Sequence, residues 1–140
     1  MSSKILYITR RAEFAASHRL KVTGWDDNAN SIAFGKCANL HNHGHTYTIE
    51  LTVAGTPDET TGMLMDLTEL KKLIQEHIIN HVDHKNLNED VPWLQGINPT
   101  AENLCVEFWK RIQPYMPAHV RLYKIKIWET ENNAAAYKGE

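Results

Sequence analysis

Residues 43–54 alternate between apolar and polar side chains, and this segment constrains the fold more than any other part of the sequence. Its apolar positions share one parity and are Tyr47, Ile49, Leu51 and Val53. Threonine and glutamate hold the positions between them. Because successive side chains of a strand point to opposite faces, the pattern predicts a half-buried strand with one face against a core.

Three more strands are expected from similar but less regular alternation, over residues 4–18, 120–130 and 134–138. Residues 21–36 are rich in asparagine, aspartate, glycine and serine, and this composition predicts a loop.

Two helices are expected between the strands. Asp66 has the position of an N-cap, and Glu69 follows it in the spacing of a capping box. The apolar stripe of this helix is Leu67, Leu70, Ile74 and Ile78. Thr100 caps a second helix, which Pro114 ends. Its stripe is Leu104, Phe108 and Ile112, with Cys105 beside it as a further core residue.

The order of these elements predicts an α+β fold, with a four-stranded antiparallel sheet and two helices on one face. So small a sheet leaves two open edges, which oligomerisation can close. The 140 residues fit one domain over residues 1–140.

Composition excludes several classes of function. The net charge is −2 and the basic residues are scattered, so the chain lacks the electrostatic footprint of a nucleic-acid or membrane-surface protein. No apolar run approaches the roughly 18 residues of a transmembrane helix. Two cysteines are too few for a disulfide framework. We therefore expect a soluble, reduced, cytoplasmic protein.

Three of the eight histidines are expected to converge. His43 and His45 lie two apart at the start of the central strand, on its apolar parity, and His18 ends the first strand on that strand's apolar parity. Three neutral imidazoles at a dry site suit Zn²⁺ with an open fourth position, as in a catalytic site. A surface or core histidine pair is the alternative. His41 is expected to be exposed or hydrogen bonded, because a fourth protein ligand would close the site.

Three other positions carry possible chemistry. Cys37 follows Lys36 near the histidines, and a thiolate there is able to act as a base or a nucleophile, although a buried inert cysteine fits equally well. Asp83 precedes His84, and an aspartate can orient a histidine for proton transfer, but adjacent side chains usually point apart.

Glu129 ends an apolar strand face, where a carboxylate must be paired or hydrogen bonded. Accepting two parallel N–H bonds from a heterocycle is one such use. A strand end that reaches solvent is the other interpretation.

Taken together, these residues resemble the 6-pyruvoyltetrahydropterin synthase family over nearly the whole chain. The segments that carry the resemblance are 14–20, 34–37, 43–47, 61–67, 82–87, 100–103, 128–130 and 137–140. The resemblance implies the tunnelling fold (T-fold), in which three subunits close their sheets into a barrel and two trimers stack into a hexamer. It also implies the substrate 7,8-dihydroneopterin triphosphate.

The resemblance further implies roles for single residues. One zinc ion per subunit would lie on His18, His43 and His45. Cys37 would be the general base, assisted by Asp83 and His84 from a neighbouring subunit. Glu129 would anchor the pterin ring, with Thr100 and Glu102 nearby. Two departures from the family pattern are Ala101, where a hydroxyl residue is often found, and His41, where a non-ionisable residue is usual.

The closest rival is 6-carboxytetrahydropterin synthase of queuosine biosynthesis, which shares the fold, metal and substrate but releases acetaldehyde. Its cysteine typically stands four residues before the first histidine of the His-Gly-His pair. Cys37 precedes His43 by six, which favours the pyruvoyl enzyme, although Cys37 and His41 have the shorter spacing. A non-catalytic metal- or pterin-binding protein is a second rival. A structural zinc module is a third, and it predicts unfolding on chelation.

Overall fold

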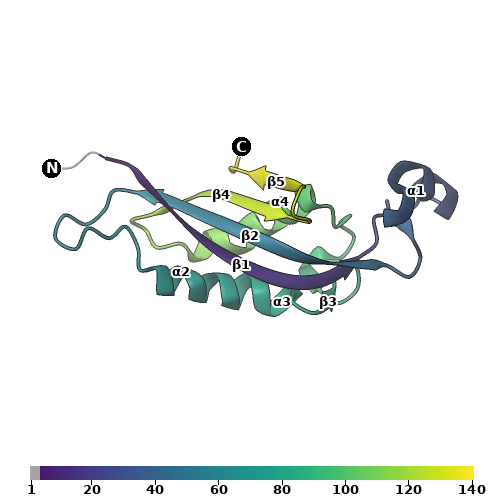
Figure 1. Cartoon of the computed structure of the whole chain (residues 1–140), viewed down its shortest axis with the longest axis horizontal. Helices are drawn as coiled ribbons and strands as arrows, with labels where there is room; N and C mark the ends of the chain where they lie inside the picture. Colours follow the sequence, from purple (N-terminus) through teal and green to yellow (C-terminus); the bar gives the residue numbers. More distant parts are fainter. Residues whose placement is uncertain (1–3) are drawn as a thin grey trace.

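The computed structural model describes residues 4–140 and contains a five-stranded sheet with the order β3-β1-β2-β4-β5 (Figure 1). The strands are β1 Leu6–His18, β2 His43–Gly55, β3 Lys85–Asn86, β4 Arg121–Trp128 and β5 Ala134–Tyr137. β1, β2, β4 and β5 pair in an antiparallel manner, as expected. The additional strand β3 pairs in parallel with the end of β1, at only two positions.

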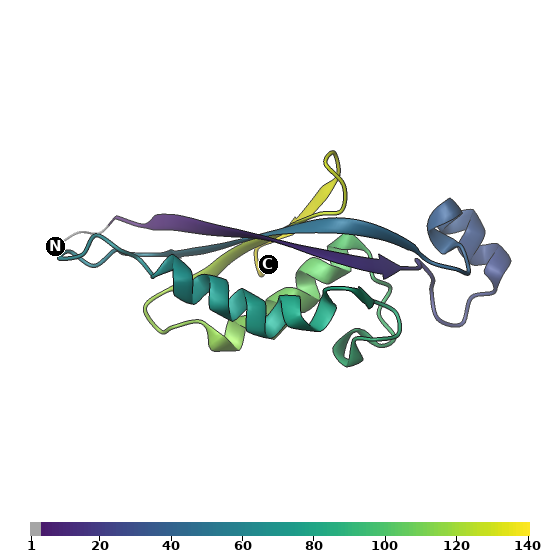
Figure 2. The same ribbon diagram turned by 60° about the horizontal axis from the view of Figure 1, so that its bottom comes forward.

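Two helical segments cover one face of the sheet, and no helix among residues 4–140 covers the other face (Figure 2). The first segment is continuous and consists of α2 Leu67–Ile74, the π-helix η2 Gln75–Ile79 and α3 Asn80–Val82. The second is α4 Ala101–Ile112. Three short 3₁₀ turns are also present: η1 Gly35–Ala38, η3 Pro92–Leu94 and η4 Gln113–Tyr115. No helix within residues 4–140 has the length and hydropathy needed to cross a membrane.

Both expected N-caps are confirmed. The Asp66 carboxylate accepts a hydrogen bond from the N–H of Thr68 at 2.8 Å. The Thr100 hydroxyl accepts one from the N–H of Asn103 at 3.1 Å. Each cap satisfies a backbone donor that has no partner inside the helix, and so fixes where the helix begins.

The expectation of a loop over residues 21–36 is wrong for its second half. Helix α1, Asp27–Phe34, forms there and stands at the end of the β1–β2 hairpin (Figure 1). Asp26 caps it by accepting from the N–H of Ala29 at 2.7 Å, and the buried Asn30 accepts from the N–H of Val22 at 2.8 Å. These side-chain bonds offset the low helix propensity of the asparagine- and aspartate-rich segment.

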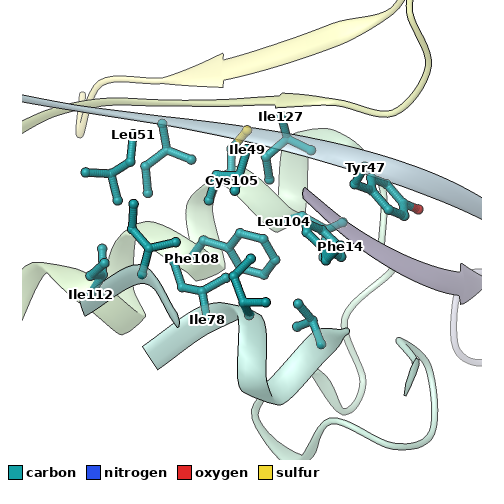
Figure 3. Close-up of a cluster of buried hydrophobic side chains, with 14 of the residues drawn as sticks. Phe14, Tyr47, Ile49, Leu51, Ile78, Leu104, Cys105, Phe108, Ile112 and Ile127 are labelled. Carbon is teal, nitrogen blue, oxygen red and sulfur yellow. The ribbon is translucent and has the colours of Figure 1, made fainter. Parts of the chain in front are cut away.

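The core lies between the helices and the apolar face of the sheet (Figure 3). The α4 stripe is fully buried, as predicted, and Cys105 is 1% exposed. Phe14 stacks on Tyr47 with ring centroids 4.8 Å apart. Leu67 belongs to the predicted helix stripe but is 46% exposed, because it is the first residue of α2. The Tyr47 hydroxyl points out of the cluster (Figure 3), and its partner there is a histidine.

Candidate metal centre

The three predicted histidines meet at the paired ends of β1 and β2. His18 is directly opposite His43 in the strand register, and Ala16 is opposite His45. The three rings therefore lie on the helix-covered face, with centroids 4.6 to 5.2 Å apart. The Nε2 atoms of His18 and His43 are 3.0 Å apart. The convergence predicted from strand parity is confirmed.

His18 is completely buried, and its surroundings fix which ring nitrogen faces the cluster. Its Nδ1 lies 2.8 Å from the carbonyl oxygen of Pro99, which only accepts hydrogen bonds, so Nδ1 carries the proton. A neutral His18 then presents an unprotonated Nε2 to the other two histidines. The Tyr47 hydroxyl contacts the same ring, 3.1 Å from Nδ1. A carbonyl that orients a histidine in this way is a common feature of metal sites.

The environment favours the neutral form of two of these rings, His18 and His43. Burial lowers the pKa of His18 and of His43, and the neighbouring imidazoles lower it further. In addition, Nδ1 of His43 and Nε2 of His45 are buried without a hydrogen-bond partner. A buried nitrogen without a partner lowers the stability of the fold. A neutral imidazole nitrogen is also the form that binds transition metals, so a metal ion would provide the missing partner.

Glu129 joins the three histidines, which the sequence did not predict. Its Oε1 lies 3.1 Å from Nε2 of His45 and 3.4 Å from Nε2 of His18. The four potential ligand atoms all lie within 4.8 Å of one another. The residue follows the end of β4, where its N–H donates to the carbonyl of Asn133 at 3.0 Å. The apolar parity of β4 was the signal that Glu129 would face inward, but parity does not reveal which groups it meets.

This donor set fits a divalent transition ion. Three neutral imidazoles and one carboxylate are preferred ligands of Zn²⁺ and chemically related ions. Ligands of a tetrahedral zinc ion lie about 3.3 Å from one another, because the metal–ligand bonds are about 2.0–2.1 Å long. The contacts of 3.0, 3.1 and 3.4 Å in the cluster are close to this spacing.

Cys37 lies in the 3₁₀ turn η1, between α1 and the start of β2, and is half-buried. The turn is tied to the end of β1 because the Cys37 carbonyl accepts from the N–H of Leu20 at 2.7 Å. The pKa of Tyr47 is raised by burial, and then by the charges of Glu129 and Cys37, so the thiol shares an electrostatic neighbourhood with the cluster. Cys105, by contrast, is a core residue whose pKa burial raises to about 11.

Asp83 and His84 form a pair at the outer edge of β1, although adjacent side chains usually diverge. His84 has a φ of 59°, and this left-handed conformation brings its Nδ1 to 3.1 Å from Oδ2 of Asp83. Oδ1 of Asp83 accepts from the N–H of Ala15 at 2.9 Å, which lowers the pKa of Asp83. The His84 side chain is 81% exposed. No side-chain contact links this pair to the histidine cluster among the described residues.

The remaining predicted positions lie around the cluster. Thr100 and the exposed Glu102 stand at the start of α4, directly after the Pro99 that holds His18. His41 is exposed and is not part of the four-residue ligand group. It lines an open cavity of about 450 Å³ together with His43 and Ser17. The Pro99 contact was missed by sequence reasoning, because a backbone carbonyl leaves no signal in the residue type.

An open antiparallel sheet with helices on one face, and a histidine–carboxylate cluster at its end, defines a T-fold protein with a candidate metal site. Residues 7–140 match the family model described as 6-pyruvoyl tetrahydropterin synthase. The chain belongs to this family.

Individual relatives agree over the full length. The 6-pyruvoyl tetrahydrobiopterin synthase of Homo sapiens is 46% identical over 133 residues, which is 95% of this chain and 91% of the human protein. The structure of 6-pyruvoyl tetrahydropterin synthase from Caenorhabditis elegans superposes with a TM-score of 0.91 at 36% identity, covering 98% of this chain and 97% of that one. A more distant relative is the dihydroneopterin monophosphate aldolase of Pyrococcus furiosus, 31% identical over 92% of this chain and 91% of its own length.

Proposed function

We propose that this protein is a zinc-dependent lyase of the 6-pyruvoyltetrahydropterin synthase type. It would convert 7,8-dihydroneopterin triphosphate to 6-pyruvoyltetrahydropterin with elimination of triphosphate. The observation that carries the proposal is the convergence of His18, His43 and His45 in a chain 46% identical to the human synthase.

In this proposal His18, His43 and His45 hold the zinc ion. When bound, zinc supplies a Lewis acid that stabilises negative charge on the oxygens of the substrate side chain. The Pro99 carbonyl keeps the His18 tautomer correct for this task. The imidazole donors favour zinc over magnesium or calcium, which prefer oxygen ligands.

Cys37 would remove a carbon-bound proton from the substrate beside the ring. A thiolate is the reactive form, and Cys37 is a free cysteine that is only half-buried in η1. Glu129 would accept N–H bonds from the pterin, with Thr100 and Glu102 on the neighbouring helix start. Fixing the ring in this way places the side chain at the metal.

Asp83 and His84 would assist the base in the site of a neighbouring copy. Their exposed position at the sheet edge supports this assignment, because it leaves the histidine free to reach another chain. The edge of β1 beyond the two positions paired with β3, and the outer edge of β5, have no partner strand among residues 4–140. Strand pairing at these edges would build the trimeric barrel, and two barrels the homohexamer, of the proposed enzyme. The free thiols Cys37 and Cys105 agree with a reducing, cytoplasmic location.

The decisive test is to incubate the protein and zinc with dihydroneopterin triphosphate and to identify every product by mass spectrometry. The proposal expects 6-pyruvoyltetrahydropterin and one equivalent of inorganic triphosphate. Acetaldehyde would instead identify a 6-carboxytetrahydropterin synthase. Binding of metal and pterin without turnover would identify a non-catalytic protein.

A second candidate function is aldol cleavage of the pterin side chain. The similarity to the Pyrococcus furiosus aldolase favours it, because that protein acts on the monophosphate of the same pterin. Cleavage between the first and second carbons of the side chain would leave the first carbon on the ring and the phosphate on a two-carbon aldehyde, and the same product assay would detect this fragment.

A further inference from the structure

The turn that carries Cys37 stands apart from the layer of helices on the sheet. Helix α1 lies beyond the ends of β1 and β2, and η1 follows it directly (Figure 1). Among residues 4–140, these two elements contact each other far more than they contact any other helix or strand. A catalytic base must nevertheless be held accurately, because a displacement of about 1 Å can lower a rate by about 10²-fold. The position of Cys37 therefore depends on whatever connects η1 to the end of β1.

Arg19 makes this connection with its side chain. Its Nε donates to the carbonyl of Ala38, the last residue of η1, at 2.8 Å. Its Nη2 donates to Oδ1 of Asp27, the first residue of α1, at 2.9 Å. The Arg19 side chain is only 12% exposed. Because Arg19 directly follows His18 at the end of β1, one residue joins the strand end at the metal centre to both elements beside Cys37.

Asn88, in the loop after β3, holds the backbone of Arg19 in place. Its Oδ1 accepts from the N–H of Arg19 at 2.7 Å, and its Nδ2 donates to the Arg19 carbonyl at 2.9 Å. These are the two bonds that a residue of a neighbouring strand would exchange with Arg19, although β1 ends one residue earlier. The next N–H, that of Leu20, donates to the Cys37 carbonyl at 2.7 Å. The segment is therefore fixed to the body on one side and to η1 on the other.

We propose that Arg19 is a positioning residue, which holds η1, and with it Cys37, against the strand end that bears His18. This inference rests on the proposed function, in which Cys37 is the base, and deepens it. The guanidinium group donates in two directions from one rigid plane, which a lysine ammonium on its flexible stem does not reproduce. Without both contacts, η1 would open locally from the end of β1 more often, while the rest of the fold stays closed.

The first experiment measures alkylation of Cys37 by iodoacetamide in protein free of metal and pterin, with mass spectrometry to separate it from the buried Cys105. Rates are compared on the alkaline plateau, where the thiol is fully ionised, so that a change in its pKa has no effect. Arg19→Met is expected to raise the plateau rate at least about 10-fold, because loss of hydrogen bonds from a charged donor favours local opening. Lys21→Met is the matched control, since Lys21 is exposed and two positions along. A rate equal to that of Lys21→Met would overturn the proposal.

Arg19→Lys serves if Arg19→Met fails to fold, as judged by the Tm of the metal-free protein. It keeps the charge but not the two-way contact, so the same increase in alkylation is expected, and a wild-type rate would contradict the proposal.

The second experiment compares kcat and KM in the lyase assay. In the folded Arg19 variant, kcat is expected to fall by about 10²-fold, with KM and zinc affinity at wild-type values. An unchanged kcat would overturn the proposal, and so would an equal loss of zinc affinity, because Arg19 would then act on the metal centre. The alkylation assay uses neither metal nor substrate, so failure of the lyase assay and failure of this inference are separate outcomes.

Discussion

In the middle and at the end of the helix-covered sheet face, the inward-pointing side chains lie on the same alternate strand positions. The two regions differ in whether these side chains find partners within the protein. In the middle, Phe14, Ile49 and Leu51 are buried against the apolar stripes of the two helices and are satisfied by them. At the end, His18 and His45 continue the same parity but bring lone pairs together, and two ring nitrogens of the cluster have no partner. The middle is complete as protein alone, whereas the end requires something that the chain does not supply.

This difference separates stability from function along one pair of strands. The core should hold the fold without metal, and the cluster should hold metal without contributing much to the fold. Each variant below acts on one of the two regions, and the expected effects decrease from the first to the last.

His45→Ala removes a ligand from the end of the sheet and should abolish both zinc binding and measurable turnover. Loss of an outer partner alone typically weakens a metal site by about 10–100-fold, and loss of a direct ligand should exceed this. His41→Ala is the matched control, because His41 is exposed and outside the ligand group. Metal analysis after gel filtration measures the zinc content of both variants. If His45→Ala retained zinc, the end of the sheet would not be the metal-binding region, and the distinction between the two regions would be wrong.

Cys37→Ala should separate binding from chemistry within the functional region. Turnover is expected to fall by about 10²–10⁴-fold, the usual contribution of a general base. Zinc content and pterin affinity should stay at wild-type values, since Cys37 is not in the ligand group. Near-normal kcat in this variant would show that the base lies elsewhere. Cys105→Ala, in the core, is the comparison for removing a thiol.

Phe108→Ala tests the middle of the sheet face. The side chain is fully buried between Phe14 and Trp93, with ring centroids 5.8 Å from each. Its removal should lower the free energy of unfolding by about 3–5 kcal/mol, measured by chemical denaturation. Zinc affinity of the folded variant should not change. A large loss of zinc affinity would mean that core packing and metal binding are coupled.

Asp83→Asn should have the smallest effect on stability, and this effect should disappear in acid. The N–H of Ala15 lowers the pKa of Asp83 below its ordinary value of 3.8. The stabilisation by this carboxylate is therefore present above about that pH and is lost as the pH falls through the lowered pKa. The difference in Tm between wild type and variant should be constant above pH 5 and shrink below pH 4. A Tm difference that grows in acid would contradict a lowered pKa of Asp83.

Strand and helix signals in the sequence predicted most of the fold because they are local. The alternation in β2, the caps at Asp66 and Thr100 and the stripe of α4 each depend on neighbours within a few residues, and all are confirmed. Helix α1 was missed because its stability depends on specific side-chain bonds of Asp26 and Asn30 rather than on composition.

The candidate site was predictable only where strand parity determined it. Parity placed His18, His43 and His45 on one face, and antiparallel register brought them together. The contacts of Glu129 and of the Pro99 carbonyl join segments more than 80 residues from His18. No local pattern encodes such contacts, because they depend on where the fold places the end of β4, on the far side of β2, and the start of α4 relative to β1.

The most direct test of the account is metal content measured together with chelation. One zinc ion or similar transition ion per chain is expected in the native protein by elemental analysis. A chelator should abolish turnover while circular dichroism shows the fold intact, and added zinc should restore activity. Protein without stoichiometric metal that turns over fully in chelator would contradict the account, as would a chain that unfolds when the metal is removed.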